Sequence, residues 1–334
     1  MNLLSNPDRS SDYVPQNITV IGAGAWGSAI AFLLNQNHHQ VQIWSRQSEV
    51  PLSAMVADSD VIISAVSIKG VRAIATQLQT ANLRPDVILV SATKGLEPST
   101  LATPSQIWRS LLPVYPLVVL SGPNLSKEIM AGQPTATVVA SEHPHAAQLV
   151  QNIFASRNFR VYTNPDPIGV ELGGTLKNVI AIAVGACDGL NLGTNAKSAL
   201  ITRSLIEIIR VGVFFGAQPE TFWGLSGLGD LLATCNSSLS RNYQVGYAIA
   251  QGKSLEAAIA STVGTAEGVN TAHVLMEICD RAQISVPVSR YVHRLLRGEI
   301  TLQQAVEGLM DRDLKAESLQ EHSWVVKAVR SPIW

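Results

Sequence analysis

The first half of the chain, residues 17–163, alternates short apolar runs with longer helical patterns. The runs are rich in β-branched residues and stay apolar at consecutive positions, which is typical of strands buried on both faces of a parallel sheet. Five strands are predicted, at residues 18–21, 41–44, 61–65, 87–90 and 117–120, and a helix is predicted at residues 25–35. This alternation indicates an α/β fold with an open, doubly wound parallel sheet.

The pattern changes at Asn164-Pro165-Asp166-Pro167, where two prolines interrupt both strand and helix. Beyond this point the β-rich runs end, and helices are predicted at residues 169–187, 194–216, 240–251, 267–283 and 289–298. We therefore predict a sheet domain over residues 17–164 and an all-helical domain over residues 165–334. Residues 1–16 are polar, lack an apolar stretch of signal-peptide type and are predicted to be a disordered leader.

The composition narrows the classes of function. A length of 334 residues favours two domains, and a hydrophobic share of 46% supports extensive buried packing. The formal net charge is -1, so no basic excess indicates binding to nucleic acid or to a membrane surface as the main task. Cys187, Cys235 and Cys279 lack metal-ligand spacing, so we expect buried core residues in a reducing compartment and no metal.

No segment reaches the roughly 18 uncharged apolar residues that a membrane span needs. The most apolar helical stretch, residues 198–216, is interrupted by Arg203, Glu207 and Arg210. We expect a cytoplasmic protein without stable membrane insertion.

The run Gly22-Ala23-Gly24-Ala25-Trp26-Gly27 matches the pattern G-x-G-x-x-G between the first predicted strand and the first predicted helix. Here Gly22 permits a tight turn, Gly24 lets a pyrophosphate approach the backbone, and Gly27 lets the helix pack closely. The N–H groups at the start of the helix also favour a negative pyrophosphate. The run predicts a Rossmann-like domain that binds NAD or NADP; the alternative is a tight turn without a ligand.

The second predicted strand ends in Trp44-Ser45-Arg46, with no acidic residue to hold the ribose hydroxyls of NAD. Arg46 offers a cation for the 2′-phosphate of NADP, so the sequence favours NADPH as the cofactor. The alternative is that Arg46 is a solvated surface residue.

Two lysines and an aspartate stand where chemistry is expected. Lys94 follows the fourth predicted strand, at the sheet edge where ligands bind, and either polarises a carbonyl, holds a charged substrate or is only exposed. Lys177 lies inside an apolar helix, where a lysine is rarely buried without a task unless its ammonium reaches the surface. Asp230 follows a glycine-rich turn and could orient a lysine, bind a substrate hydroxyl or only cap a helix.

The run Ser240-Arg241-Asn242 begins another predicted helix. Ser240 is a candidate helix cap, and the planar guanidinium of Arg241 suits a phosphate, which the N-terminus of a helix also favours. Glu267 opens a further helix, where it need be no more than an acid in the first turn.

Taken in order, these segments resemble the NAD(P)-dependent glycerol-3-phosphate dehydrogenases of the bacterial type. The resemblance runs from Ile18 to about Glu317, and the ordered set of motifs is specific although each motif alone is not. The motifs are residues 22–27, 91–95, 121–124, 171–172, 177–179, 227–231, 240–242, 309–310 and 314–317.

The resemblance implies an enzyme that interconverts sn-glycerol 3-phosphate and dihydroxyacetone phosphate. It implies that Lys177 is the proton acceptor, that Lys94 stabilises charge on the reacting oxygen and that Asp230 holds a lysine in place. The implied substrate-binding residues are Lys94, Gly122, Asn124, Lys177, Asp230, Ser240, Arg241 and Asn242. The implied cofactor-binding residues are Gly22, Gly24, Ala25, Trp26, Gly27, Arg46, Lys94, Ser126, Arg241 and Glu267.

The sequence departs from the family at two positions, both near the cofactor. The stretch between Arg46 and the third predicted strand is shorter than is usual, and Ala25 stands where many relatives have serine. Two rival functions stay open: a β-hydroxyacid dehydrogenase of the same fold, and a non-catalytic NADP sensor that binds a partner protein. The resemblance implies reduction of dihydroxyacetone phosphate for phospholipid synthesis, and a homodimer is expected on base rate alone.

Overall fold

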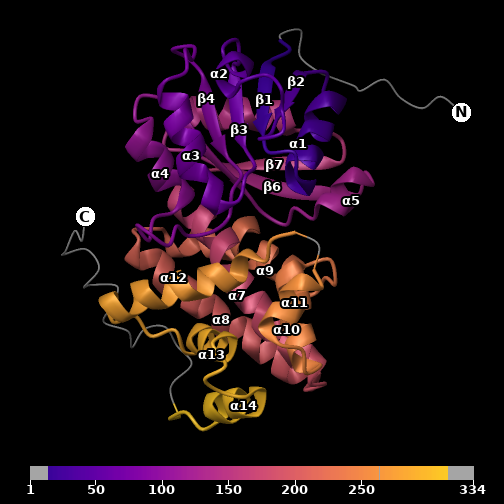
Figure 1. Ribbon diagram of the computed structural model, residues 1–334, viewed down its shortest axis with the longest axis vertical. Coiled ribbons are helices and arrows are strands. Elements are labelled where there is room, and N and C mark those ends of the chain that lie inside the picture. Colours follow the sequence, from indigo (N-terminus) through magenta and orange to yellow (C-terminus); the bar gives the residue numbers. More distant parts are fainter. Residues whose placement is uncertain (1–13, 263, 315–334) are drawn as a thin grey trace, which may run out of the picture.

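The computed structural model describes residues 14–262 and 264–314. Figure 1 shows two parts, a sheet flanked by helices and, below it in this view, a bundle of helices. Within the described residues, seven strands form one sheet in the order β2-β1-β3-β4-β5-β6-β7. Their bounds are β1 Asn17–Ile21, β2 Gln40–Trp44, β3 Val61–Ser64, β4 Ile88–Ser91, β5 Leu117–Ser121, β6 Thr135–Ala140 and β7 Phe159–Asn164. The five predicted strands are β1 to β5, so the predicted α/β fold is confirmed.

The sequence pattern does not single out β6 and β7, and the sheet is not wholly parallel. Strand β6 pairs antiparallel with β5, and β7 then runs parallel to β6. The connection between β5 and β6 holds only the short helix α5 (Ser126–Met130). Parallel neighbours need a crossover that carries the chain back along the sheet, usually a full helix, so this connection yields an antiparallel pair instead.

Both faces of the sheet are buried, because neighbouring residues within a strand point to opposite sides. Ile63 and Val90 pack into a core with α1 and α6, whereas Ile62 and Leu89 pack into a second core with α3 and α4. The flanking helices are α1 (Ala25–Gln36), α3 (Ile68–Gln79), α4 (Pro104–Leu111) and α6 (Pro144–Phe154). The continuous apolar runs of the strands follow from this two-sided burial.

The second part is helical, as predicted. The predicted helices correspond to α7, α8, α10, α12 and α13, and their ends differ from the prediction by at most two residues. The helices of this part are α7 (Pro167–Gly189), α8 (Gly193–Phe214), α9 (Asp230–Cys235), α10 (Arg241–Ala250), α11 (Leu255–Ala260), α12 (Glu267–Ala282), α13 (Pro287–Leu296) and α14 (Leu302–Met310). Helices α9, α11 and α14 escape prediction because each is too short for a periodic pattern.

Helix α7 is the core helix of the second part. It has a window with a mean hydropathy of 1.4, long and apolar enough to cross a membrane, but 94% of that window is buried inside the protein. Residues 198–216, within and just beyond α8, are predicted to be the most apolar helical stretch. This prediction is wrong, because α7 is the more apolar helix. Cys187, Cys235 and Cys279 are buried and free, as predicted.

Asp166 lies between the end of β7 and the start of α7, where the two parts of the chain meet. Its carboxylate accepts the N–H of Gly169 at 2.8 Å and so caps α7, and it also binds Gln218 and Thr221 at 2.8 Å each. The predicted domain boundary at residues 164 and 165 stays a prediction. The predicted leader lies outside the described residues except for residues 14–16, and residues 315–317 of the last family motif also lie outside them.

Candidate active site

The glycine turn between β1 and α1 is packed so tightly that side chains are excluded at two of its three glycines. Gly22 has a φ of +118°, and a Cβ there would lie 2.8 Å from the carbonyl oxygen of Ala65. A Cβ at Gly27 would lie 1.8 Å from the carbonyl oxygen of Gly22. In contrast, a Cβ at Gly24 would have nothing within 4 Å, and no side chain caps the N-terminus of α1. The open space beside Gly24 and the uncapped N-terminus of α1 together fit a pyrophosphate.

Four other predicted cofactor residues lie along this end of the sheet. Ala25 is exposed at the start of α1, and the indole N–H of Trp26 donates to the carbonyl oxygen of Ala92 at 3.2 Å. Arg46 is exposed just after β2, and Ser126 is the first residue of α5. Because β2 and β3 pair with opposite sides of β1, this edge is the switch point at which doubly wound sheets bind ligands.

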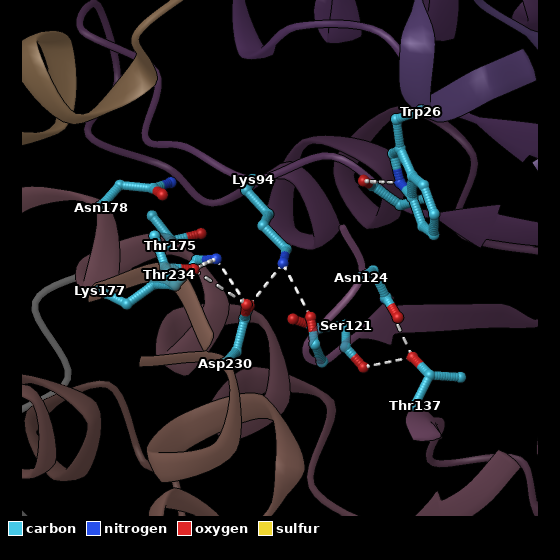
Figure 2. A network of polar contacts seen from close by, with 12 residues as sticks. Trp26, Lys94, Ser121, Asn124, Thr137, Thr175, Lys177, Asn178, Asp230 and Thr234 are labelled. Atoms are coloured by element: carbon cyan, nitrogen blue, oxygen red, sulfur yellow. Dashed lines mark hydrogen bonds and ion pairs between the residues drawn. The ribbon is translucent and has the colours of Figure 1, made fainter. Parts of the chain in front are cut away.

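A buried carboxylate joins the two predicted catalytic lysines (Figure 2). Asp230 is 1% exposed and binds Lys94 through one oxygen and Lys177 through the other, at 2.5 Å in each case. Lys94 comes from the segment after β4 and also donates to the carbonyl oxygen of Gly122 at 3.3 Å. Lys177 comes from the middle of α7 and is 7% exposed. The structure therefore brings together Lys94, Lys177 and Asp230 from three separate segments of sequence.

Local structure explains why Asp230 faces inward. Asp230 follows a single π-helical turn, Leu225–Gly229, and is the first residue of α9, whose cap is Gly229. The helix-cap role that the sequence leaves open for Asp230 is therefore excluded. Gly173 and Gly174 let α7 approach this turn and Ser121, because their Cβ atoms would lie 2.7 Å from the carbonyl oxygen of Ser226 and 2.2 Å from the hydroxyl of Ser121.

The electrostatics of Lys177 suit proton transfer. Burial lowers the pKa of Lys177 to about 8, because desolvation of the ammonium outweighs the attraction of Asp230, and the charge of Lys94 lowers it further. A lysine with a pKa near 8 populates both its protonated and its neutral form close to neutral pH. The sequence alone does not decide whether the pKa of Lys177 is raised or lowered.

Sequence reasoning missed Thr234, which lies one helical turn after Asp230. Lys177 donates to the hydroxyl of Thr234, and that hydroxyl donates to Asp230 at 3.3 Å. Threonine is common in helices, so only its spacing of four residues from Asp230 could have drawn attention to it.

Two buried polar atoms face the same region without a partner among the described residues. The side-chain N–H of Asn124 donates to Thr137 at 3.0 Å, and Thr137 donates to the carbonyl oxygen of Ser121 at 2.8 Å. The carbonyl oxygen of the Asn124 side chain and the hydroxyl of Ser121 are left unsatisfied. Buried polar groups normally have partners, so this pair marks a place where a polar ligand fits. Gly122, with a φ of +139°, forms the turn between them.

The residues around α10 divide into structural and accessible groups. The hydroxyl of Ser240 caps α10 by accepting the N–H of Tyr243 at 3.3 Å. Asn242 donates to Asn178 at 3.0 Å and accepts the N–H of Gly268 at 2.9 Å, so its side chain ties α10 to α7 and α12. Its position therefore favours a supporting role over direct contact with a phosphate.

Arg241 and Glu267 lie near each other at the start of α10 and α12. Arg241 is exposed, and a Cβ on Gly264 would come within 2.6 Å of its guanidinium. Burial raises the pKa of Glu267, while the positive charges of Arg241 and Lys69 lower it. The guanidinium is thus accessible to an anion, and Glu267 is more than a solvated first-turn acid. Among the described residues, no group of three or more His, Cys, Asp or Glu side chains could hold a metal.

The family of the chain follows from models of both its halves. The N-terminal model of NAD-dependent glycerol-3-phosphate dehydrogenase matches residues 17–52 and 49–147, and the C-terminal model matches residues 166–307. The chain belongs to this family. The two stretches of the N-terminal match meet after Arg46, where the sequence predicts a shortened connection, and the structure has only the four-residue helix α2 (Leu52–Met55) there.

Individual relatives agree with this assignment. A glycerol-3-phosphate dehydrogenase [NAD(P)+] of Synechocystis sp. is 63% identical over 303 residues, which cover 91% of this chain and 96% of the relative. One of Trichormus variabilis is 60% identical over 300 residues, covering 90% and 98%. The crystal structure of glycerol-3-phosphate dehydrogenase from Coxiella burnetii has a TM-score of 0.85 at 32% identity, covering 89% of this chain and 99% of that chain.

Proposed function

We propose that the chain interconverts sn-glycerol 3-phosphate and dihydroxyacetone phosphate, with Lys177 as the residue that moves the proton. The observation that carries this proposal is the buried carboxylate of Asp230, which binds the ammonium groups of Lys94 and Lys177 at 2.5 Å each. Two cations held at one carboxylate suit a reaction in which negative charge develops on an oxygen. Family membership favours this function over a β-hydroxyacid dehydrogenase and over a non-catalytic sensor.

The lysines have separate tasks in the proposed mechanism. In oxidation, the neutral amine of Lys177 takes the proton from the hydroxyl group at carbon 2 of glycerol 3-phosphate. In reduction, its ammonium returns that proton to the oxygen of dihydroxyacetone phosphate. Lys94 stabilises the charge on this oxygen, and Asp230 keeps both lysines oriented. Gly122 and Asn124 border the substrate.

Hydride transfer to or from carbon 2 of the substrate is the chemistry that a bound nicotinamide cofactor would supply. We propose that Gly22, Gly24 and Gly27 hold its pyrophosphate at the start of α1. Further contacts to the dinucleotide are proposed for Ala25, Trp26, Arg46, Lys94, Ser126, Arg241 and Glu267. The Ser121 hydroxyl and the Asn124 side-chain oxygen, which have no partner among the described residues, flank Gly122, to which Lys94 donates, and offer hydrogen bonds there.

NADPH is the proposed preferred cofactor, because Arg46 is exposed at the end of β2 where no acid competes for the ribose. Arg46→Ala should weaken NADPH binding on the order of tenfold, since an exposed charge-assisted hydrogen bond is screened by solvent. Binding of NADH should change little. Equal losses for both cofactors, measured by fluorescence titration, would exclude contact between Arg46 and the 2′-phosphate.

Arg241 is the proposed phosphate anchor, with Ser240 and Asn242 holding the start of α10 in place. Arg241→Ala should raise the KM for dihydroxyacetone phosphate strongly, and Arg241→Lys should rescue only part of the loss because a point charge lacks the bidentate fork. Unphosphorylated dihydroxyacetone is the comparison substrate. If its turnover fell equally, Arg241 would not act through the phosphate.

The proposed physiological direction is reduction, which supplies glycerol 3-phosphate for phospholipid synthesis. We further propose that the protein works in the cytoplasm, without nucleic acid or stable membrane insertion. A homodimer is proposed on base rate alone.

The experiment that tests the activity is oxidation of NADPH and NADH by the purified protein, followed by the absorbance of the reduced nicotinamide. Dihydroxyacetone phosphate should support turnover, whereas unphosphorylated dihydroxyacetone and a 3-oxo acid should not. Turnover only with the 3-oxo acid would point to the rival dehydrogenase, and cofactor binding without turnover on any substrate would point to a sensor.

A further inference from the structure

The segment that carries Lys94 is held from both parts of the molecule. On the sheet side, the hydroxyl of Thr93 donates to the carbonyl oxygen of Val66 at 2.8 Å. On the helical side, the N–H of Gly95 donates to the hydroxyl of Thr175 at 3.1 Å, and Asn270 donates to the carbonyl oxygen of Leu96 at 3.0 Å. Lys94 therefore lies between anchors from two domains.

The contact with Thr175 is the one closest to the reacting groups. Thr175 is fully buried and lies on α7 only two residues before Lys177. Gly95 directly follows Lys94 and has a φ of +143°, and a Cβ there would lie 3.0 Å from the side chain of Ile68. The backbone next to Lys94 is thus fixed in a conformation that favours glycine, with its N–H aimed at the helix that carries Lys177.

We propose that Thr175 is a positioning residue for the reaction: its hydroxyl accepts the N–H of Gly95 and thereby holds the Lys94 ammonium against Asp230, at a fixed place relative to Lys177. In Figure 2, Thr175 lies on the same helix as Lys177 and Asn178, with Lys94 and Asp230 beside it. This inference rests on the proposed roles of Lys94 and Lys177.

The position of Lys94 decides the charge that Lys177 experiences. The groups that act on Lys177 are Asp230, which raises its pKa, Lys94, which lowers it, and the thiol of Cys235. If Lys94 moves away, Asp230 is left to pair with Lys177 alone, and the pKa of Lys177 rises. Loss of the Thr175 hydroxyl should therefore change both the rate and its pH dependence, whereas a purely structural role would change only stability.

The test is Thr175→Val, which replaces the hydroxyl with a methyl group of similar size. We expect turnover to fall about tenfold, since misplacing a catalytic group by about 1 Å can cost on the order of 10²-fold. The acid limb of the pH profile for oxidation should move to higher pH. Thr175→Ser keeps the hydroxyl and should restore both properties, so a defect in the serine variant as large as that in the valine variant overturns the proposal.

A matched control is Thr271→Val on α12. Thr271 is also fully buried in a helix, but its hydroxyl has no partner among the described residues. This variant should keep wild-type turnover and pH dependence. If Thr175→Val behaved like Thr271→Val in both measurements, the proposed positioning role would be wrong.

A double-variant comparison separates positioning from loss of folding. Thr175→Val should have no further effect on turnover in a Lys94→Met protein, because the group that it positions is already gone. If the losses of turnover caused by Thr175→Val and Lys94→Met instead multiplied in the double variant, the proposal would be overturned. Thr175→Ala replaces Thr175→Val in this comparison if the valine variant does not fold. Failure of the proposed function is distinguishable, since the wild-type protein would then not turn over dihydroxyacetone phosphate. Failure of the proposed lysine roles would instead leave Lys94→Met and Lys177→Met with their turnover.

Discussion

Helices α7 and α8 pack against each other, and each carries a lysine paired with an aspartate. Lys177 on α7 binds Asp230 at 2.5 Å, and both side chains are less than a tenth exposed. Lys197 on α8 binds Asp188 at 2.7 Å, and these side chains are 20% and 28% exposed. The inner pair includes a second cation, Lys94, from the other domain, whereas the outer pair lies beside Tyr243. A lysine–aspartate pair is therefore no sign of catalysis until its burial and neighbours are known.

The two helices also carry similar buried glutamates. Glu207 on α8 accepts the backbone N–H groups of Val288 and Ser289 at 2.7 and 3.0 Å, and so caps α13. Glu171 on α7 accepts the N–H and the hydroxyl of Ser105 at 2.9 and 2.6 Å, and so caps α4 in the sheet domain. Glu207 thus joins two helices of the helical domain, whereas Glu171 joins the helical domain to the sheet domain. Burial of a charge in an apolar helix thus has structural as well as catalytic causes.

The largest expected difference between α7 and α8 is in turnover, when the lysine of each helix is replaced in Lys177→Met and Lys197→Met. Methionine keeps the length and apolar packing of lysine but carries no proton. Lys177→Met should lose roughly 10²–10⁴-fold in turnover, as is typical when a general acid–base group is removed. Lys197→Met should keep its turnover, because Lys197 pairs with Asp188 and not with Asp230.

Steady-state kinetics with dihydroxyacetone phosphate measures this difference, with NADPH affinity and Tm as controls for folding. Both variants should bind NADPH like wild type. Near-normal turnover of Lys177→Met, or an equal loss in Lys197→Met, would remove the proposed proton-transfer role.

A second difference concerns stability. Glu207→Ala should lower the free energy of unfolding by about 3 kcal/mol, because it leaves two buried backbone N–H groups without a partner, at roughly 1–3 kcal/mol each. Turnover per folded molecule should stay unchanged. Urea unfolding measures the loss, and Ser204→Ala on the same helix is the control, since among the described residues the Ser204 hydroxyl donates only to the carbonyl oxygen of Leu200 in its own helix. A large loss of turnover with unchanged stability would contradict the assignment of Glu207 to structure.

Much of this architecture follows from the sequence, since apolar runs and breakers identify β1 to β5 and the five longer helices. The antiparallel pairing of β6 does not follow, because it depends on how the chain returns after β5. Lys177 and Asp230 stand out because each is a charged residue in an unusual local setting. Thr175 and Thr234 do not stand out, because a hydroxyl in a helix is ordinary until its partner, distant in sequence, is known.

The same limit explains Glu207. Its sequence context, an acid within an apolar helix, resembles that of Lys177, yet its partners lie at the start of α13. Local pattern identifies residues that need a partner, and tertiary structure decides whether that partner is a ligand, a second charge or a helix end.

The smallest expected difference is the pH dependence of stability from the two glutamates. Burial raises the pKa of both Glu171 and Glu207 from 4.5 to about 7. The folded protein therefore holds these protons more tightly than the unfolded chain does. The resulting stabilisation is fully present below about pH 4.5 and is lost as the pH rises through about 7.

Urea unfolding of wild type, Glu171→Gln and Glu207→Gln between pH 5 and pH 8 tests this linkage, because glutamine cannot titrate. Each variant should show a shallower decline of stability with rising pH than wild type. Glu207→Gln should keep its turnover at every pH, whereas Glu171→Gln should lose some, since the segment that carries Lys94 leads into α4, which Glu171 caps. If both variants kept the slope of wild type, burial would not perturb these carboxyl groups; if both kept full turnover, the contact between α7 and α4 would only hold the domains together.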